Sequence, residues 1–245
     1  MKEIYEKNKV FIKMYDYKNL NNVEKRALNN KVQSLYKRNK IKKIKNGLYT
    51  MTNPINDSVY VNKYEIGTAM FSKAYIGYHT ALEYYGLNNQ MSREVQVMVE
   101  KPEREVEFEN VKYKFYIGDG KSVIEKENYA KIYITSLEKT IFDCVNNIKY
   151  AGGLEELYKA VECIKYIDEN KLLKILEYYN NDKVYQKIGW LFYVANKNVL
   201  SNKFYQICKS KVKVMVDLRE NKKNSSKFFK EWNIIAPKYL FWEGI

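Results

Sequence analysis

The side chains best suited to chemistry in this sequence are cationic and gather towards the N-terminus. Residues 40–50 read K-I-K-K-I-K-N-G-L-Y-T, with lysines on either side of an Asn-Gly pair. Lysine ammonium groups neutralise phosphates, and Asn-Gly is a strong signal for a hairpin turn because both residues tolerate positive φ. The stretch therefore predicts two short strands, 41–44 and 47–51, that form a basic hairpin. Of Lys42, Lys43 and Lys45, at least two should project into solvent.

A helix predicted just before this hairpin carries side chains that can read nucleic acid. Leu28, Val32 and Leu35 recur at steps of four and three, so they share one helix face. Asn and Gln pair with adenine edges, and Arg and Lys reach guanine or phosphate. We expect base contacts from Asn29, Asn30, Gln33 and Lys37. We expect phosphate contacts from Lys25, Arg26, Arg38, Lys42, Lys43 and Lys45. The alternative is an ordinary solvated polar face.

The net charge of +14 is concentrated in two regions of the 245-residue chain. Residues 1–57 carry +9 and residues 201–230 carry +7, whereas residues 58–200 carry −1. Two basic regions around a neutral middle favour a polyanion partner, with double-stranded DNA the first candidate. The second region predicts a secondary basic patch of Lys203, Lys209, Lys211, Lys213, Lys222 and Lys223. That patch either contacts flanking phosphates or is unrelated to the DNA site, and the residues do not decide between the two.

Most catalytic and cofactor sites are disfavoured, so we expect no enzyme, no cofactor and no metal site. His79 is the sole histidine, which excludes H-E-x-x-H metal sites, and a packed or capping role fits it better. Residues 117–122 read I-G-D-G-K-S, but Phe115 stands where a phosphate-binding loop needs its first glycine.

We expect a cytoplasmic protein that is not inserted in a membrane. The three cysteines are odd in number and far apart, which fits a reducing compartment. The sequence contains neither a membrane-length apolar run nor a signal-peptide apolar region.

Two other function classes stay open. Acidic residues of the middle region could serve a metal-dependent nuclease: Glu94, Glu100, Glu103, Glu105, Glu107 and Glu109. A solvated hairpin accounts for the last four of them equally well. A pure protein-interaction module is the third reading.

The fold predicted to position these side chains is α+β. A winged helix-turn-helix over 1–55 is built from helical segments within 3–15 and 20–40 and the basic hairpin, and a linker follows it. The segment within 20–40 is either one helix or two that break near 28–30. A larger mixed α/β domain over 59–245 ends in a helical, bundle-like region. Within it we expect a half-buried strand at 94–100, further strands at 112–117, 131–135 and 212–218, and helices at 64–71, 80–85 and 137–145. Further helices are expected throughout 154–210, and the apolar tail should fold back onto the core.

Four stretches together resemble the AbiEi family, the antitoxin-repressors of abortive-infection toxin–antitoxin systems. They read L-Y-K-R-N-K-I-K-K-I-K-N-G-L-Y at 35–49 and Y-I-G-Y-H-T-A-L-E-Y-Y-G-L at 75–87. The third reads I-T-S-L-E-K-T-I-F-D-C-V at 134–145, and the fourth is V-M-V-D-L at 214–218 with E-W-N-I at 231–234. The resemblance departs from the family pattern at Thr80, where serine is frequent, and in the missing turn glycine before the recognition helix.

The resemblance implies a function for both domains. It implies an N-terminal winged helix that represses its own operon by binding inverted repeats upstream. It also implies a C-terminal domain that is needed for full repression and for antitoxicity. The implied partner is an AbiEii-like nucleotidyltransferase toxin, countered without a stable complex.

Overall fold

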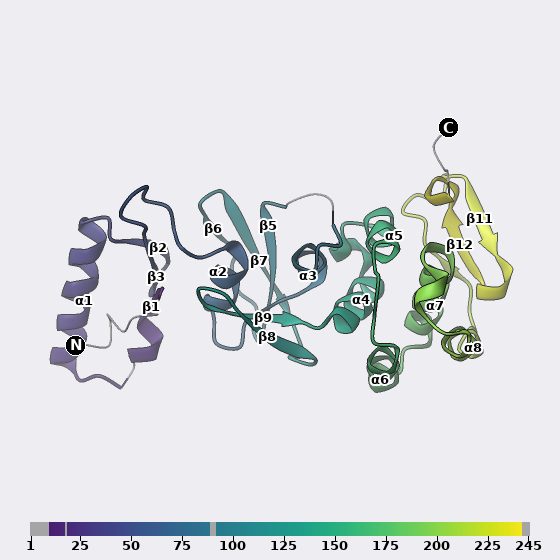
Figure 1. Cartoon of the computed structure of the whole chain (residues 1–245), viewed down its shortest axis with the longest axis horizontal. Helices are drawn as coiled ribbons and strands as arrows, with labels where there is room; N and C mark the ends of the chain where they lie inside the picture. Colours follow the sequence, from purple (N-terminus) through teal and green to yellow (C-terminus); the bar gives the residue numbers. More distant parts are fainter. Residues whose placement is uncertain (1–9, 18, 89–91, 242–245) are drawn as a thin grey trace. The chain divides into compact units, whose positions relative to one another are not determined.

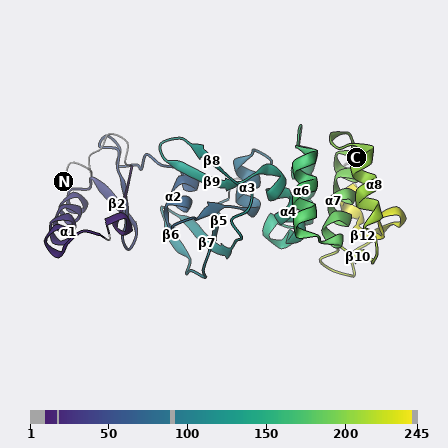
Figure 2. The ribbon, with the colours of Figure 1, turned by 90° about the horizontal axis from the view of Figure 1, so that it is seen from below.

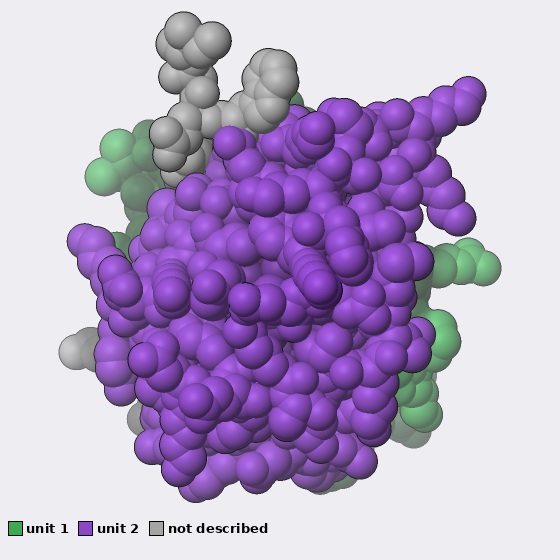
Figure 3. Space-filling model, turned by 90° about the vertical axis from the view of Figure 1, so that its right-hand side faces the viewer, with its two compact units in different colours: residues 1–76, 92–134 green, residues 77–91, 135–245 purple. Residues whose placement is uncertain are grey.

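The computed structural model describes residues 10–17, 19–88 and 92–241, and it is a mixed α/β protein, as predicted. The chain divides into two compact units (Figure 3). Unit 1 comprises residues 1–76 and 92–134, and unit 2 comprises residues 77–91 and 135–245. The predicted boundary between domains at 55–59 stays a prediction.

Unit 1 begins with a small sheet packed on one long helix (Figure 1). Strands β1 (Phe11–Lys13), β2 (Ile41–Lys45) and β3 (Leu48–Met51) form an antiparallel sheet in the order β1-β3-β2. Helix α1 (Asn22–Lys37) is continuous, and Asn21 begins it with a capping box to Glu24.

The helix predicted within 3–15 is wrong where the structure describes it. Residues 11–13 are strand β1, and Met14–Tyr17 form a single 3-10 turn, because β1 pairs with β3 and this pairing overrides the loose helical pattern. Residues 1–9 lie outside the described part of the chain.

The hairpin β2–β3 forms at the predicted place, with Gly47 at a φ of 76° in the turn. Its register shifts between Lys43 and Lys45, which marks a β-bulge. The bulge explains how Ile41 and Ile44, three residues apart, are both buried, although strict alternation would place them on opposite faces.

The rest of unit 1 is a six-stranded sheet covered by a short helix. The sheet contains β4 (Tyr75–Ile76), β5 (Glu94–Val99), β6 (Val106–Phe108), β7 (Val111–Ile117), β8 (Val123–Glu127) and β9 (Lys131–Thr135), in the order β6-β7-β5-β4-β9-β8. Helix α2 (Lys63–Ala69) packs on it (Figure 1). Strand β5, predicted as half-buried, is buried almost throughout because it lies inside the sheet with α2 against it.

Unit 2 is mainly helical (Figure 2). Its helices are α3 (Tyr78–Tyr84), α4 (Leu137–Asn146), α5 (Leu154–Glu162), α6 (Glu169–Tyr179), α7 (Asp182–Ala195) and α8 (Asn202–Ser210). Ser136 caps α4 by accepting a hydrogen bond from the Lys139 amide. Almost all the helices predicted in this region are confirmed, within a few residues at each end.

A second small sheet closes unit 2. Strands β10 (Val216–Asp217), β11 (Ser226–Phe229) and β12 (Ile234–Pro237) form it in the order β10-β12-β11. The strand predicted over 212–218 shrinks to two residues, since its pairing with β12 starts only at Val216 and the preceding Val214 and Met215 are exposed. The amide of Gln186 holds this sheet to α7 by donating to the carbonyls of Val214, Trp232 and Asn233 at 3.0, 2.7 and 3.2 Å.

In the described residues, no helix combines the length and the apolar character needed to cross a membrane.

Candidate nucleic-acid interface

Helix α1 has one apolar face and one polar face. Leu28 and Val32 are 6% and 2% exposed, and they pack in one core cluster with Ile12 and Ile41 of the small sheet. Burial of this stripe fixes the rotation of the helix, so the opposite face must point to solvent. All seven of the predicted contact residues on this helix and its C-cap are exposed: Lys25, Arg26, Asn29, Asn30, Gln33, Lys37 and Arg38.

The spacing of these side chains produces two adjacent rows. Residues four apart on a helix stand one above the other, so Asn29, Gln33 and Lys37 form one row. Arg26 and Asn30 form the start of the next row by the same rule. The exposed face therefore offers amide groups in its middle and cations towards both ends.

The hairpin β2–β3 presents fewer free cations than the sequence predicts. The side chain of Lys43 is exposed and that of Lys42 is 38% exposed, so two of the three lysines reach solvent as expected, whereas Lys45 is half-buried. Lys42 forms an ion pair with Glu109 in the turn between β6 and β7.

Lys45 is held differently. Its ammonium lies 3.3 Å from the centre of the Phe71 ring, a cation–π contact. Burial lowers the pKa of Lys45, an effect that the negative charge of Glu103 partly opposes. Long-range contacts with the rest of unit 1 therefore engage two of the three hairpin lysines predicted to hold phosphates.

The acidic residues of the middle region are mostly paired with lysines. Glu94 pairs with Lys114 at 2.5 Å, Glu100 with Lys73 at 2.7 Å and Glu105 with Lys112 at 3.4 Å. Across residues 10–17, 19–88 and 92–241, no three His, Cys, Asp or Glu side chains lie close enough to hold a metal ion together. The paired lysines account for these carboxylates as components of a solvated surface.

The six lysines of the predicted secondary patch fall into two groups. Lys211 and Lys213 both reach Asp182, at 3.8 and 2.6 Å, and Lys209 pairs with Glu231. Lys203, Lys222 and Lys223 are exposed, and within the described residues none of these three forms an ion pair. The patch is therefore smaller than the sequence implies.

The predicted role of His79 as a packed residue fits its surroundings. Its side chain is 17% exposed, and its Nε2 lies 3.1 Å from a Glu156 carboxylate oxygen and 2.6 Å from the Asn88 amide nitrogen. These contacts join α3 to α5 inside unit 2.

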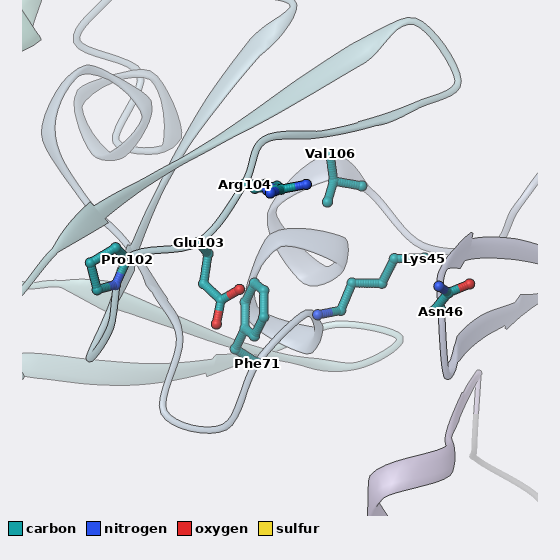
Figure 4. A pocket seen from close by; sticks show the side chains of 7 residues that line it. All are labelled: Lys45, Asn46, Phe71, Pro102, Glu103, Arg104 and Val106. Carbon is teal, nitrogen blue, oxygen red and sulfur yellow. The ribbon is translucent and has the colours of Figure 1, made fainter.

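The structure also brings together residues that sequence reasoning missed. Arg104, in the loop before β6, lines an open cleft with Lys45 and Asn46 of the hairpin (Figure 4). No local signal could have revealed this, because the partners lie almost sixty residues apart in the chain and meet only through tertiary structure. The sequence pattern around Arg104 indicates a charged turn and nothing more.

Comparison with known proteins identifies a solved structure of similar fold but assigns the chain to no family. No known protein family and no curated protein matches the sequence. Among solved structures, the chain is similar to the RV2827C protein from Mycobacterium tuberculosis, with a TM-score of 0.62 at 8% sequence identity. The alignment covers 92% of this chain and 86% of that one. Almost the whole fold therefore has a solved counterpart, and at this identity the likeness concerns the fold alone.

Proposed function

We propose that this protein is a sequence-specific repressor that binds double-stranded DNA through α1 and the hairpin β2–β3. The observation that carries the proposal is the exposed face of α1, where four side chains able to pair with base edges lie between cations. An α-helix is about 10–12 Å across with its side chains, which matches the roughly 12 Å width of the DNA major groove. Asn29, Asn30, Gln33 and Lys37 are then the base-reading residues, and Lys25, Arg26, Arg38 and Lys43 hold phosphates beside them.

The topology around α1 supports a winged helix. The helix is followed at once by a two-stranded hairpin that would act as the wing, and β1 completes the sheet behind it in the order β1-β3-β2. The 3-10 turn Met14–Tyr17 takes the position of the helix expected before the recognition helix. This turn is shorter than the helix that the sequence pattern predicts.

We further propose that the repressor acts as an antitoxin. This part of the proposal is supported by the resemblance of four stretches to AbiEi proteins. The operator would be inverted repeats upstream of the protein's own operon, and the antagonist would be an AbiEii-like nucleotidyltransferase toxin. The C-terminal domain would add affinity on DNA and counter the toxin without a stable complex. A nucleotidyltransferase reading frame beside this gene is the expected genomic signature.

A binding assay tests the DNA part of the proposal. Fluorescence anisotropy with duplex DNA from upstream of the gene, against a shuffled duplex of equal length, should show tighter binding to the upstream sequence. Replacing Gln33 by Ala should reduce that preference by about 1–3 kcal/mol, the discrimination carried by one bidentate base contact. The matched control is Gln206→Ala, since Gln206 is also exposed on a helix, α8.

Three outcomes separate the function classes. Equal binding of both duplexes at all salt concentrations would contradict sequence-specific recognition. Cleavage of the duplex in the presence of Mg²⁺, lost on replacing one of the middle-region glutamates, would establish the nuclease instead. Absence of any DNA binding at low salt would favour the third function class, a pure protein-interaction module. The antitoxin part is tested separately, by whether co-expression of this protein restores growth of cells that produce the neighbouring nucleotidyltransferase.

A further inference from the structure

A cleft in unit 1 lies where the tip of the hairpin β2–β3 meets the six-stranded sheet. Its volume is about 630 Å³, and Figure 4 shows the side chains that line it. The hairpin contributes Lys45 and Asn46, and the sheet side contributes Phe71 and the loop before β6. The loop residues in the lining are Pro102, Glu103, Arg104 and Val106. The cleft is thus shared by two parts of the fold that are distant in sequence.

The cationic groups of this cleft have no carboxylate bonded to them. Among the described residues, neither the ammonium of Lys45 nor the guanidinium of Arg104 forms a hydrogen bond or an ion pair with an acid. Burial lowers the pKa of Lys45, so its charge is partly desolvated, and its ammonium lies against the Phe71 ring. An anion in the cleft would supply the missing counter-charge.

The chemistry of the lining fits phosphate. A guanidinium donates two parallel hydrogen bonds that match the oxygens of a phosphate, an ammonium adds a point charge, and the Asn46 amide can donate one more bond. A single phosphate fills only a small part of about 630 Å³, which leaves room for the group that carries it. The cleft is open to solvent, which allows a longer molecule to extend from it.

We propose that this cleft is a phosphate-binding site formed jointly by the hairpin and the sheet, with Arg104 and Lys45 as its cationic ligands. If the phosphate belongs to duplex DNA, this inference rests on the proposed function and extends it. DNA contact then extends past the hairpin onto the sheet. One phosphate bridges the two parts of unit 1, so binding also fixes the position of the hairpin.

Glu103 allows the proposal to be tested by the direction in which phosphate affinity changes. Its carboxylate lies in the same lining and close enough to Lys45 to raise that group's pKa. A negative charge there opposes an incoming anion. Glu103→Gln should therefore tighten phosphate binding, whereas Arg104→Gln should weaken it, and a merely structural role for either residue would not produce opposite signs.

The first arm of the test uses inorganic phosphate and the full chain. Amide signals of Asn46 and Arg104 in ¹H–¹⁵N NMR spectra are followed during titration with sodium phosphate, against sodium chloride of equal ionic strength. We expect phosphate-specific shifts in the wild type, weakened about threefold to tenfold in Arg104→Gln, as for the loss of one exposed charge-assisted contact. Arg93→Gln is the control, because Arg93 is exposed in the same unit and does not line the cleft. Identical titrations with phosphate and chloride, or an unchanged titration of Arg104→Gln, would overturn the site.

The second arm uses a duplex and identifies the source of the phosphate. If DNA enters the cleft, Arg104→Gln should reduce the slope of log affinity against log salt by about 0.9, the value for one phosphate contact, and Glu103→Gln should raise affinity. If both variants bind DNA like the wild type while inorganic phosphate still shifts the cleft signals, the ligand is a free phosphate compound and the DNA interface excludes the cleft. Phosphate binding without any duplex binding would refute the proposed repressor and leave the site standing. Duplex binding with no effect of phosphate or of either variant would refute the phosphate site and leave the proposed repressor standing.

Discussion

The clearest prediction concerns the salt dependence of DNA binding and separates two neighbouring lysines of the hairpin. Lys43 is exposed and has no ion pair within the described residues, whereas Lys42 is already paired with Glu109. Each phosphate neutralised on duplex DNA contributes about 0.9 to the slope of log affinity against log salt. Lys43→Ala should remove that contribution, and Lys42→Ala should remove almost none.

The size of the effect follows from this slope. Between about 50 and 200 mM salt, a slope change of 0.9 alters the ratio of wild-type to variant affinity by roughly 3.5-fold. The ion pair of Lys42 is more than a third exposed, at 38% and 39% for the two side chains, so breaking it costs only about 0.2–1 kcal/mol. Glu109→Gln should therefore release Lys42 towards DNA and steepen the slope.

The assay is fluorescence anisotropy with a random-sequence duplex at four or more salt concentrations. Random sequence suffices, because the loss of a phosphate contact weakens binding about equally for all sequences. Lys126→Ala, at an exposed lysine on β8, is the matched control. Equal losses of slope for Lys42→Ala and Lys43→Ala would show that the pairing with Glu109 does not govern the hairpin on DNA. An unchanged slope for Lys43→Ala would remove the hairpin from the interface.

Four further predictions test unit 2. Gln186→Leu should lower the free energy of unfolding by about 2–4 kcal/mol, measured by urea titration, because Gln186 is 1% exposed and its loss leaves the carbonyls of Val214 and Trp232 without this donor. The carbonyl of Asn233 keeps its hydrogen bond from the Val216 amide, and a loss below 1 kcal/mol would contradict this role of Gln186. Gly189→Ala should lower the free energy of unfolding by about 1–3 kcal/mol, since an added Cβ would lie 2.5 Å from atoms of Cys208 and Trp232. Helix propensity alone suggests a higher Tm for the alanine variant, and such a gain would show that α7 is packed differently. An aromatic disulfide reagent at neutral pH should modify Cys163 rapidly and Cys208 only on unfolding, because burial raises the pKa of the Cys208 thiol to about 12. The same shift means that the unfolded chain loses this proton first, so stability should fall as pH rises above about 9.

Several structural features could be predicted from the sequence, because they depend on residues that are close together in the chain. The hairpin follows from Asn46–Gly47, and the cap of α4 follows from Ser136. The orientation of α1 follows from the spacing of Leu28 and Val32, because an apolar stripe must face the core whatever the rest of the chain does. These features also determine which side chains of α1 are exposed.

Other features could not be predicted from the sequence, because they depend on contacts between distant parts of the chain. Residues 11–13 become a strand because a partner strand lies beside them, and the burial of β5 depends on α2 and on neighbouring strands. A period-2 pattern reports which residues share a face but not whether both faces are covered.

The sequence by itself determined the charge of the hairpin, its turn and the polar face of the helix before it. Tertiary structure alone decided which of those charges are free. Lys42 meets Glu109 across more than sixty residues of chain, and Lys45 meets Phe71 across more than twenty. Electrostatic pairing depends on distance in space, and a linear pattern of lysines contains no information on which acids and rings the folded chain brings beside them.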